Sequence, residues 1–218
     1  MKGDVILVEE HHRTAANKIV TEILDVIKAN ATRFTIAIAG ESGSGKSETG
    51  KAVQDALLMH GIRSILLGQD DYFILPPKSN DAKRRDDQDW LGPHMEVRLD
   101  VLDRNLRDAI RGRSYILKPL IDYGKNTITE ERVSLEDIQV IIAEGTYTSL
   151  LKNIDIRIFI DRNRLDTLEH RTKRNRGNEV GDPFIENVLK MEHKIIAGHK
   201  QLADFIITKD YRVIFNNE

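Results

Sequence analysis

The chain has 218 residues and a formal net charge of −2, with 40% hydrophobic and 31% charged residues. This balance predicts a folded domain with a substantial core and disfavours both a disordered chain and a nucleic-acid binder that relies on excess positive charge. Cysteine is absent, which excludes disulfides and thiolate metal sites. No apolar run is long enough to cross a bilayer and the first residues lack a signal-peptide pattern, so we expect a cytoplasmic protein without a membrane partner.

Short apolar runs alternate with helical patterns along the chain, which predicts an α/β fold with a mainly parallel sheet flanked by helices. The helical patterns cover residues 14–29, 46–60, 97–111, 164–175 and 183–199. The apolar runs, typical of strands buried on both faces, cover residues 34–39, 64–67, 140–143, 156–160 and 205–208. We expect one domain over residues 1–218.

Two other stretches depart from this alternation. Residues 115–133 contain two β-leaning pieces around a turn at residues 122–125, which indicates a hairpin attached to the sheet. Residues 74–96 are polar and predict a mobile substrate-side loop, with a plain solvated loop as the alternative. The adjacent His11 and His12 are interpreted as an exposed helix start.

The strongest motif is G-x-x-x-x-G-K-S at residues 40–47, between an apolar run and a helical pattern. Glycines allow backbone N–H groups to surround phosphate oxygens, and the following helix presents its positive end. We expect Lys46 to neutralise the transferred phosphate and Ser47 to bind Mg²⁺. The residues predicted to hold ATP here are Gly40, Ser42, Gly43, Ser44, Gly45, Lys46, Ser47 and Glu48.

Acidic residues follow two of the apolar runs, at the sheet edge where ligands bind in parallel α/β folds. Asp70 and Asp71 come after residues 64–67, and either carboxylate can accept the proton of an attacking hydroxyl; Asp70 can also help to hold the metal. Glu144 follows residues 140–143 and is predicted to orient Mg²⁺. The alternative for these acids is a turn, a cap or a solvated strand end.

Residues 171–182 begin with a basic run that predicts a lid. Arg171, Arg174 and Arg176 can neutralise the phosphoryl group in flight, with Arg174 as a catalytic group. The alternative is a solvated helix end, where cations suit the helix dipole. Trp90 is a candidate for stacking on a substrate ring, although a lone tryptophan also packs against the protein body.

These residues together resemble the uridine kinase and phosphoribulokinase group of P-loop kinases over about residues 34–208. Gln-Asp-Asp-Tyr-Phe at residues 69–73 is similar to the Gln-Asp-Ser-Phe-Tyr of uridine kinases and the Gln-Asp-Asp-Phe-Phe of nicotinamide riboside kinases. The resemblance implies Asp70 as the catalytic base, with Asp71 and Tyr72 beside the substrate. Residues 119–123 resemble a Pro-x-Tyr-Asp stretch that holds the nucleoside, which implies roles for Asp122 and Tyr123.

The resemblance implies a three-layer P-loop NTPase fold that uses ATP and Mg²⁺ to phosphorylate a small molecule, the 5′-hydroxyl of a uridine- or cytidine-like nucleoside. Residues 89–96 depart from the uridine kinase pattern, and the helix over residues 14–30 is additional. Nicotinamide riboside, a sugar or another alcohol is therefore an alternative acceptor. A non-catalytic nucleotide-binding switch or regulator is the alternative from another class, although no N-K-x-D motif is present. Homo-oligomerisation stays open.

Overall fold

The computed structural model describes residues 6–168, 172 and 181–216. Its main sheet has six strands in the order β2-β5-β1-β6-β7-β8. The first five strands run parallel to one another, and β8 pairs antiparallel with β7. The strands are β1 (Phe34–Gly40), β2 (Ser64–Gly68), β5 (Val140–Glu144), β6 (Ile156–Ile160), β7 (Phe205–Ile207) and β8 (Val213–Phe215). The predicted mainly parallel sheet is confirmed, and β8 is a strand that the sequence patterns did not indicate.

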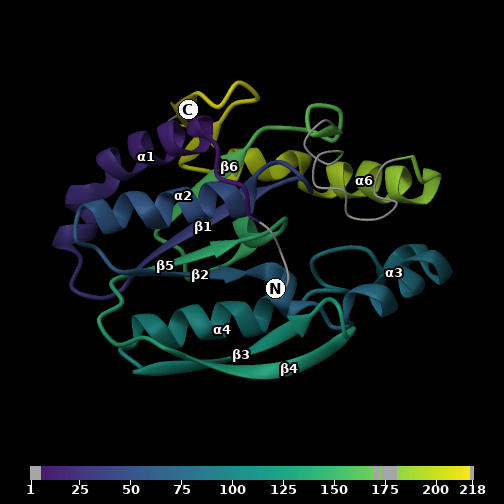
Figure 1. Cartoon of the computed structure of the whole chain (residues 1–218), viewed down its shortest axis with the longest axis horizontal. Helices are drawn as coiled ribbons and strands as arrows, with labels where there is room; N and C mark the ends of the chain where they lie inside the picture. The colour runs from purple at the N-terminus through teal and green to yellow at the C-terminus, as the bar shows by residue number, and fades with distance from the viewer. Residues whose placement is uncertain (1–5, 169–171, 173–180, 217–218) are drawn as a thin grey trace.

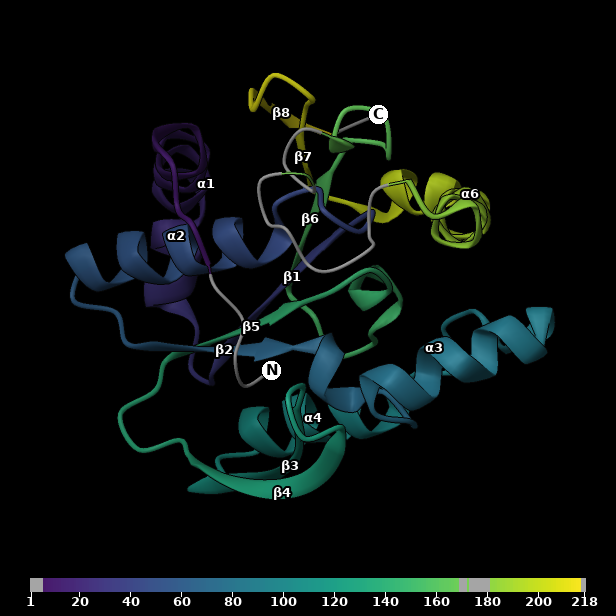
Figure 2. The ribbon, with the colours of Figure 1, turned by 45° about the vertical axis from the view of Figure 1, so that its right-hand side comes forward.

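Helices cover both faces of this sheet, so the fold has three layers (Figures 1 and 2). Along β1, Ile36 and Ile38 belong to the core shared with α1 (Glu10–Ala29) and α2 (Lys46–Met59), whereas Ala39 belongs to the core on the other face. That second core includes residues of α4 (Leu99–Ile110) and α6 (Pro183–Ile196). A strand buried on both faces has no polar side to alternate with, which explains its continuous apolar sequence.

The predicted hairpin is present, but it does not join the main sheet. β3 (Tyr115–Asp122) and β4 (Thr127–Ser134) form a separate two-stranded antiparallel sheet next to α4 (Figure 1). Three buried side chains from this region, Ile116, Ile121 and Leu135, anchor it to the body of the protein.

The loop conformation expected for residues 74–96 is wrong, because most of these residues are helical. This segment contains α3 (Pro77–Asp86) and the 3₁₀ helix η2 (Gln88–Trp90). Proline suits the first turn of a helix, where its missing N–H is not needed, and Pro77 occupies that position. Ion pairs between residues four apart, Arg85 with Asp81 at 3.1 Å and Lys83 with Asp87 at 3.0 Å, support a helix that has almost no apolar face.

Helix α1 begins four residues before the predicted start, at Glu10. His12 is fully buried rather than exposed, with its ring beside Gly45 and Tyr211. Its Nδ1 accepts a hydrogen bond from the Glu9 backbone N–H at 3.1 Å in a capping box. Within the part of the chain that the structure describes, no helix is both long and apolar enough to span a membrane.

Candidate active site

The phosphate-binding loop connects β1 to α2 at the carboxyl end of the sheet. Gly45 caps α2 with a left-handed backbone (φ 96°), and a Cβ there would lie 3.0 Å from His12 Nε2. Only glycine tolerates this combination of conformation and contact. The Lys46 ammonium donates a hydrogen bond to the Glu41 carbonyl at 2.8 Å, which holds the side chain back over its own loop. Gly40 and Ser44, in contrast, are buried beneath the loop surface.

A cavity of about 200 Å³ opens above this loop. It brings together residues from five separate parts of the chain, and two of the acids predicted at strand ends, Asp70 and Glu144, are among them. The cavity is lined by Ser42, Gly43, Gly45, Lys46, Ser47, Glu48, Asp70, Arg84, Glu144, Thr146, Ile185, Val188, Leu189 and Glu192.

Glu144 and Ser47 form a pair suited to a magnesium ion. The Ser47 hydroxyl donates to Glu144 Oε1 at 3.3 Å. The pKa of Glu144 is raised to about 7, mainly by burial and also by the neighbouring Asp70, while Lys46 opposes the shift. A hydroxyl and two carboxylates around one space are the hard oxygen ligands that Mg²⁺ prefers, and a divalent cation would favour ionised Glu144. The residues present therefore fit the metal.

Helix α6 holds the phosphate loop through two consecutive residues. The Glu192 carboxylate accepts hydrogen bonds from the Ser42 backbone N–H at 2.6 Å and from its hydroxyl at 2.9 Å. His193 Nδ1 lies 2.5 Å from Glu41 Oε1. Burial raises the pKa of Glu192, whereas Lys46 and the bonds from Ser42 lower it. Sequence reasoning missed this contact between α6 and the loop.

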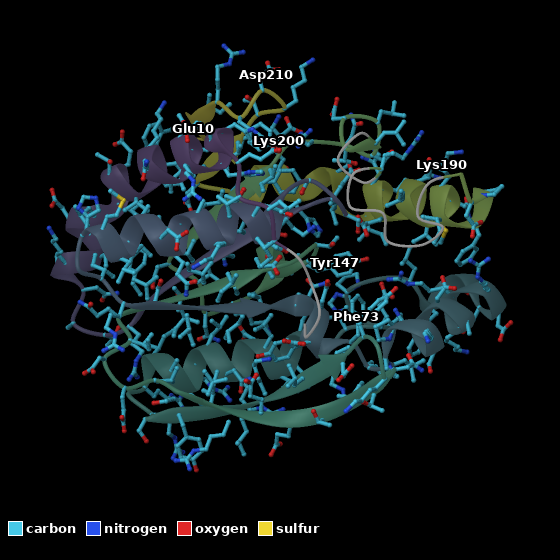
Figure 3. The ribbon with its side chains drawn as sticks, in the orientation of Figure 1. Glu10, Phe73, Tyr147, Lys190, Lys200 and Asp210 are labelled. Carbon is cyan, nitrogen blue, oxygen red and sulfur yellow. The ribbon has the colours of Figure 1, made fainter. Side chains whose placement is uncertain are left out.

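A polar network forms the side of the cavity nearest α3. One of its residues, Arg84, lines the cavity and was not predicted from the sequence. The Arg84 guanidinium donates to the fully buried Glu96 carboxylate at 2.7 Å, and Asn80 donates to the same carboxylate at 3.0 Å. The Trp90 ring N–H donates to Asn80 Oδ1 at 2.7 Å, which holds the ring beside α3, and Trp90 is not among the residues that line the cavity. Figure 3 shows Phe73 and Tyr147 at this end of the molecule, between the sheet and helices α3 and α6.

Four residues predicted to touch the substrate lie away from the cavity lining. Asp71 and Tyr72 are buried, at 3% and 0% exposure, because both anchor their segment to neighbouring elements. Asp122 accepts a hydrogen bond from the Lys125 backbone N–H at 3.0 Å and shapes the hairpin turn, where Tyr123 is 47% exposed. Asp71 and Asp122 thus make contacts with or within the hairpin, and Tyr72 makes one with the neighbouring α4. The predicted lid arginines, Arg171, Arg174 and Arg176, fall outside the described residues.

A phosphate loop that shares one cavity with a strand-end aspartate defines the class of protein as a P-loop kinase. Among curated proteins, the chain is 30% identical over 182 residues to a uridine kinase of Bacillus thuringiensis (strain Al Hakam), covering 79% of this chain and 84% of that one. The chain therefore belongs to the uridine kinase and phosphoribulokinase-like family of P-loop kinases, whose members are phosphotransferases with a hydroxyl acceptor. No family model matches the sequence.

A second curated relative has a different acceptor in its name. The chain is 29% identical over 189 residues to the bifunctional alpha-galactosidase/sucrose kinase AgaSK of Mediterraneibacter gnavus, covering 82% of this chain. The match spans only 20% of that longer protein. The relatives together show that this protein is a small-molecule kinase, and their kinase activity implies ATP as the phosphate donor.

Solved structures agree on the fold. A D-glycerate 3-kinase from Cryptococcus neoformans superposes with a TM-score of 0.59 at 12% identity, covering 94% of this chain and 98% of that chain. Phosphoribulokinase from Rhodobacter spheroides superposes with a TM-score of 0.60 at 12% identity, covering 82% of this chain and 71% of that chain. The three-layer α/β architecture is thus that of P-loop kinases.

Proposed function

We propose that this protein transfers the γ-phosphate of ATP to a hydroxyl group with Asp70 as the general base. The observation that carries this proposal is that Asp70 shares one cavity with Lys46 of the phosphate loop. An alcohol is a poor nucleophile until a positioned carboxylate accepts its proton, and an acid at this place supplies that function. Asp71 is the alternative base from the sequence, and its burial among hairpin contacts favours Asp70.

The other residues of the cavity receive roles from the same geometry. The backbone N–H groups of the loop and Lys46 bind the phosphates, while Ser47 and Glu144, with Asp70 nearby, would hold Mg²⁺. Bound Mg²⁺ supplies neutralisation of the charge that develops on the phosphates. Catalysis then rests on positioning and electrostatics and needs no covalent intermediate. The roles of Arg171, Arg174 and Arg176 as a lid stay a prediction. An ATP-dependent role of this kind is compatible with the expected cytoplasmic location.

For the acceptor, we propose first the 5′-hydroxyl of a nucleoside, because the uridine kinase relative aligns over most of both chains. A sugar hydroxyl is the second candidate, and one observation favours it. Among the described residues that line the cavity none is aromatic, whereas Arg84 and Glu192 are charged. Aromatic faces suit stacking on a base, and charged groups suit hydroxyls of a sugar. The name of the relative AgaSK, which includes a sucrose kinase, agrees with this second candidate.

The test is ATP turnover with a panel of uridine, cytidine, nicotinamide riboside, sucrose and hexoses, measured for the wild type, Asp70→Asn and Asp25→Asn. Asp25 is exposed on α1, away from the cavity, and is the matched control. We expect one acceptor class to stimulate turnover, Asp70→Asn to lower kcat by about 10²- to 10⁴-fold, and Asp25→Asn to match the wild type. Full activity of Asp70→Asn would contradict the role of Asp70 as the base. If no compound on the panel stimulates ATP turnover, the acceptor classes proposed are wrong.

A further inference from the structure

The 3₁₀ helix η1 (Gln69–Tyr72) follows β2 and carries the proposed base, Asp70. Its other three side chains are all buried. Gln69 Oε1 accepts a hydrogen bond from the Tyr147 backbone N–H at 2.7 Å, and the Tyr72 hydroxyl accepts one from Asn105 Nδ2 at 2.9 Å. Each of these bonds ties η1 to a different part of the fold, the segment after β5 in one case and α4 in the other.

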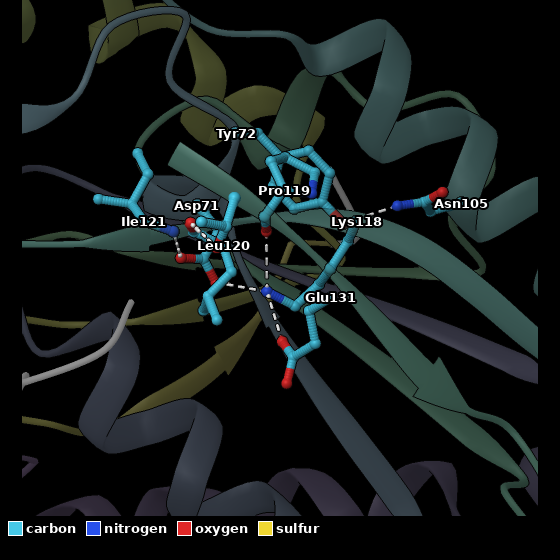
Figure 4. Close-up of polar contacts among 9 residues, drawn as sticks. Asp71, Tyr72, Asn105, Lys118, Pro119, Leu120, Ile121 and Glu131 are labelled. Atoms are coloured by element: carbon cyan, nitrogen blue, oxygen red, sulfur yellow. Dashed lines mark hydrogen bonds and ion pairs between the residues drawn. The ribbon is translucent and has the colours of Figure 1, made fainter. Parts of the chain in front are cut away.

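The strongest of these ties is an ion pair between Asp71 and Lys118 of β3 (Figure 4). The Lys118 ammonium lies 2.6 Å from Asp71 Oδ2, and the exposed fractions of the two side chains are 7% and 5%. Asp71 Oδ1 accepts a hydrogen bond from the Ile121 backbone N–H at 3.1 Å. Both carboxylate oxygens are therefore held by β3, from two points three residues apart.

Lys118 is equally constrained. Besides Asp71, its ammonium donates to the Pro119 carbonyl at 3.1 Å and lies 3.3 Å from Glu131 Oε2 on β4. An ammonium has three protons, and three acceptors surround it. Contacts on Asp71 and contacts on Lys118 therefore both fix the orientation of the ion pair, as Figure 4 shows.

A buried ion pair is an unusual way to gain stability. Removing two charges from water costs about as much as their attraction returns, and apolar side chains of similar volume often serve at least as well. An ion pair with several hydrogen bonds gives something that apolar packing does not, namely one defined orientation. The pair between Asp71 and Lys118 is therefore better explained by what it orients than by the stability it adds.

We propose that Lys118 and Asp71 are positioning residues for phosphoryl transfer, acting through Asp70. In a 3₁₀ helix, successive side chains project about 120° apart. With Asp71 held on the hairpin and Gln69 held on the segment after β5, the remaining direction for Asp70 is toward the cavity, which its side chain lines. The inference rests on the proposed role of Asp70 as the base. It makes the hairpin part of the catalytic apparatus, although no hairpin residue lines the cavity.

The test compares Lys118→Met with the double variant Asp71→Leu/Lys118→Met, using the acceptor that the wild type phosphorylates. The single variant leaves a buried charge without its partner, so it should lose both stability and kcat. The double variant removes both charges, so its urea midpoint should lie above that of the single variant. We expect kcat to stay about 10- to 100-fold below that of the wild type in both, with the KM for ATP within about twofold, because a misplaced base slows transfer without weakening phosphate binding.

Arg33→Met is the matched control for losing a cation that ties distant segments together. Arg33 donates to the carbonyls of Ala109, Leu135 and Ile138, at 2.8, 2.8 and 3.0 Å, at the edge of the sheet opposite the cavity. It should lower the urea midpoint and leave kcat unchanged. A double variant with kcat within about twofold of the wild type would overturn the inference, as would an equal loss in Arg33→Met. If Asp70→Asn is as active as the wild type, the proposed base fails instead, and the inference fails with it.

Discussion

The two sides of the cavity are built by different means. On the phosphate side, one continuous segment, residues 40–47, forms the loop with backbone groups and a lysine from its own sequence. On the acceptor side, Asp70 and Arg84 are each held by partners from other elements, through Asp71 with Lys118 and through Glu96. The phosphate side therefore takes its binding groups from one local segment, which α6 also holds through Glu192, whereas the groups of the acceptor side come from segments that only folding brings together. We therefore expect changes on the acceptor side to leave phosphate binding intact.

Lys46→Met is the sharpest way to break the phosphate side. It removes the cation beside the phosphates, and kcat/KM should fall by about 10²- to 10³-fold through loss of transition-state stabilisation. Steady-state kinetics measure the effect. Lys51→Met is the control, because Lys51 also lies on α2 but pairs with Asp55 at 2.8 Å on the surface. A kcat/KM of Lys46→Met within tenfold of the wild-type value would contradict the role given to this side chain.

Gly145→Ala acts where the two sides meet. A Cβ at Gly145 would lie 2.2 Å from Gln69 Cβ, so the segment after β5 and η1 must separate. We expect a loss of about 1–3 kcal/mol in the free energy of unfolding and a lower kcat, because η1 carries Asp70. Urea unfolding measures the loss of stability, and steady-state kinetics measure kcat. Gly198→Ala, which meets nothing within 4 Å, should change neither; equal losses in the two variants would refute the steric argument.

Glu192→Gln tests the contact between α6 and the phosphate loop through pH. The pKa of Glu192 is raised above its ordinary 4.5 by burial, so the folded state binds its proton more tightly than the unfolded state. This contribution to stability is present at low pH and is lost as the pH rises from 4.5 through the raised pKa. The free energy of unfolding of the wild type, relative to Glu192→Gln, should therefore fall over that range, by about 1.4 kcal/mol for each pKa unit.

Denaturation of the ATP-free protein at several pH values gives the measurement for Glu192. Glu22→Gln, on the exposed face of α1, is the control and should follow the wild type at every pH. A constant difference between wild type and Glu192→Gln would show that burial does not perturb this carboxyl group.

Trp90→Phe should have the smallest effect and would sharpen the comparison. It removes the hydrogen bond to Asn80, which is worth about 1 kcal/mol, and keeps a smaller aromatic ring at this position. We expect the KM for the acceptor to rise by about fivefold and the KM for ATP to stay the same. A matching rise in the KM for ATP would mean that the two sides are not separable in this way.

The sequence predicted the phosphate side well and the acceptor side poorly, for a physical reason. The loop at residues 40–47 and the strand and helix beside it are contiguous, so periodicity and glycine spacing are enough to find them. The positions of Asp71 and Tyr72 depend on partners 47 and 33 residues away in the chain. Nothing local distinguishes Asp71 from Asp70, and only the fold separates a buried anchor from a group in the cavity.

The sequence does contain signals for the buried position of Glu192 and for helix α3. Glu192 lies four residues from both Val188 and Ile196, inside the apolar stripe of its helix, and a charged residue in such a stripe requires a buried partner. Helix α3 has Pro77 at its start and opposite charges four residues apart, which favour a helix even without apolar periodicity. Arg84 carried no comparable signal, because its neighbours in the sequence are also basic.

Helix α1 and strand β8, far apart in sequence, are joined by a hydrogen bond. The Lys18 ammonium of α1 donates to the Val213 carbonyl of β8 at 3.0 Å, across 195 positions of sequence. During synthesis α1 emerges before β8, yet part of the surface on which α1 docks belongs to that strand. We expect the helix that lies behind Gly45 to settle late, after β8 has paired with β7. The phosphate loop, although the most local feature in sequence, would then be among the last parts of the protein to become rigid.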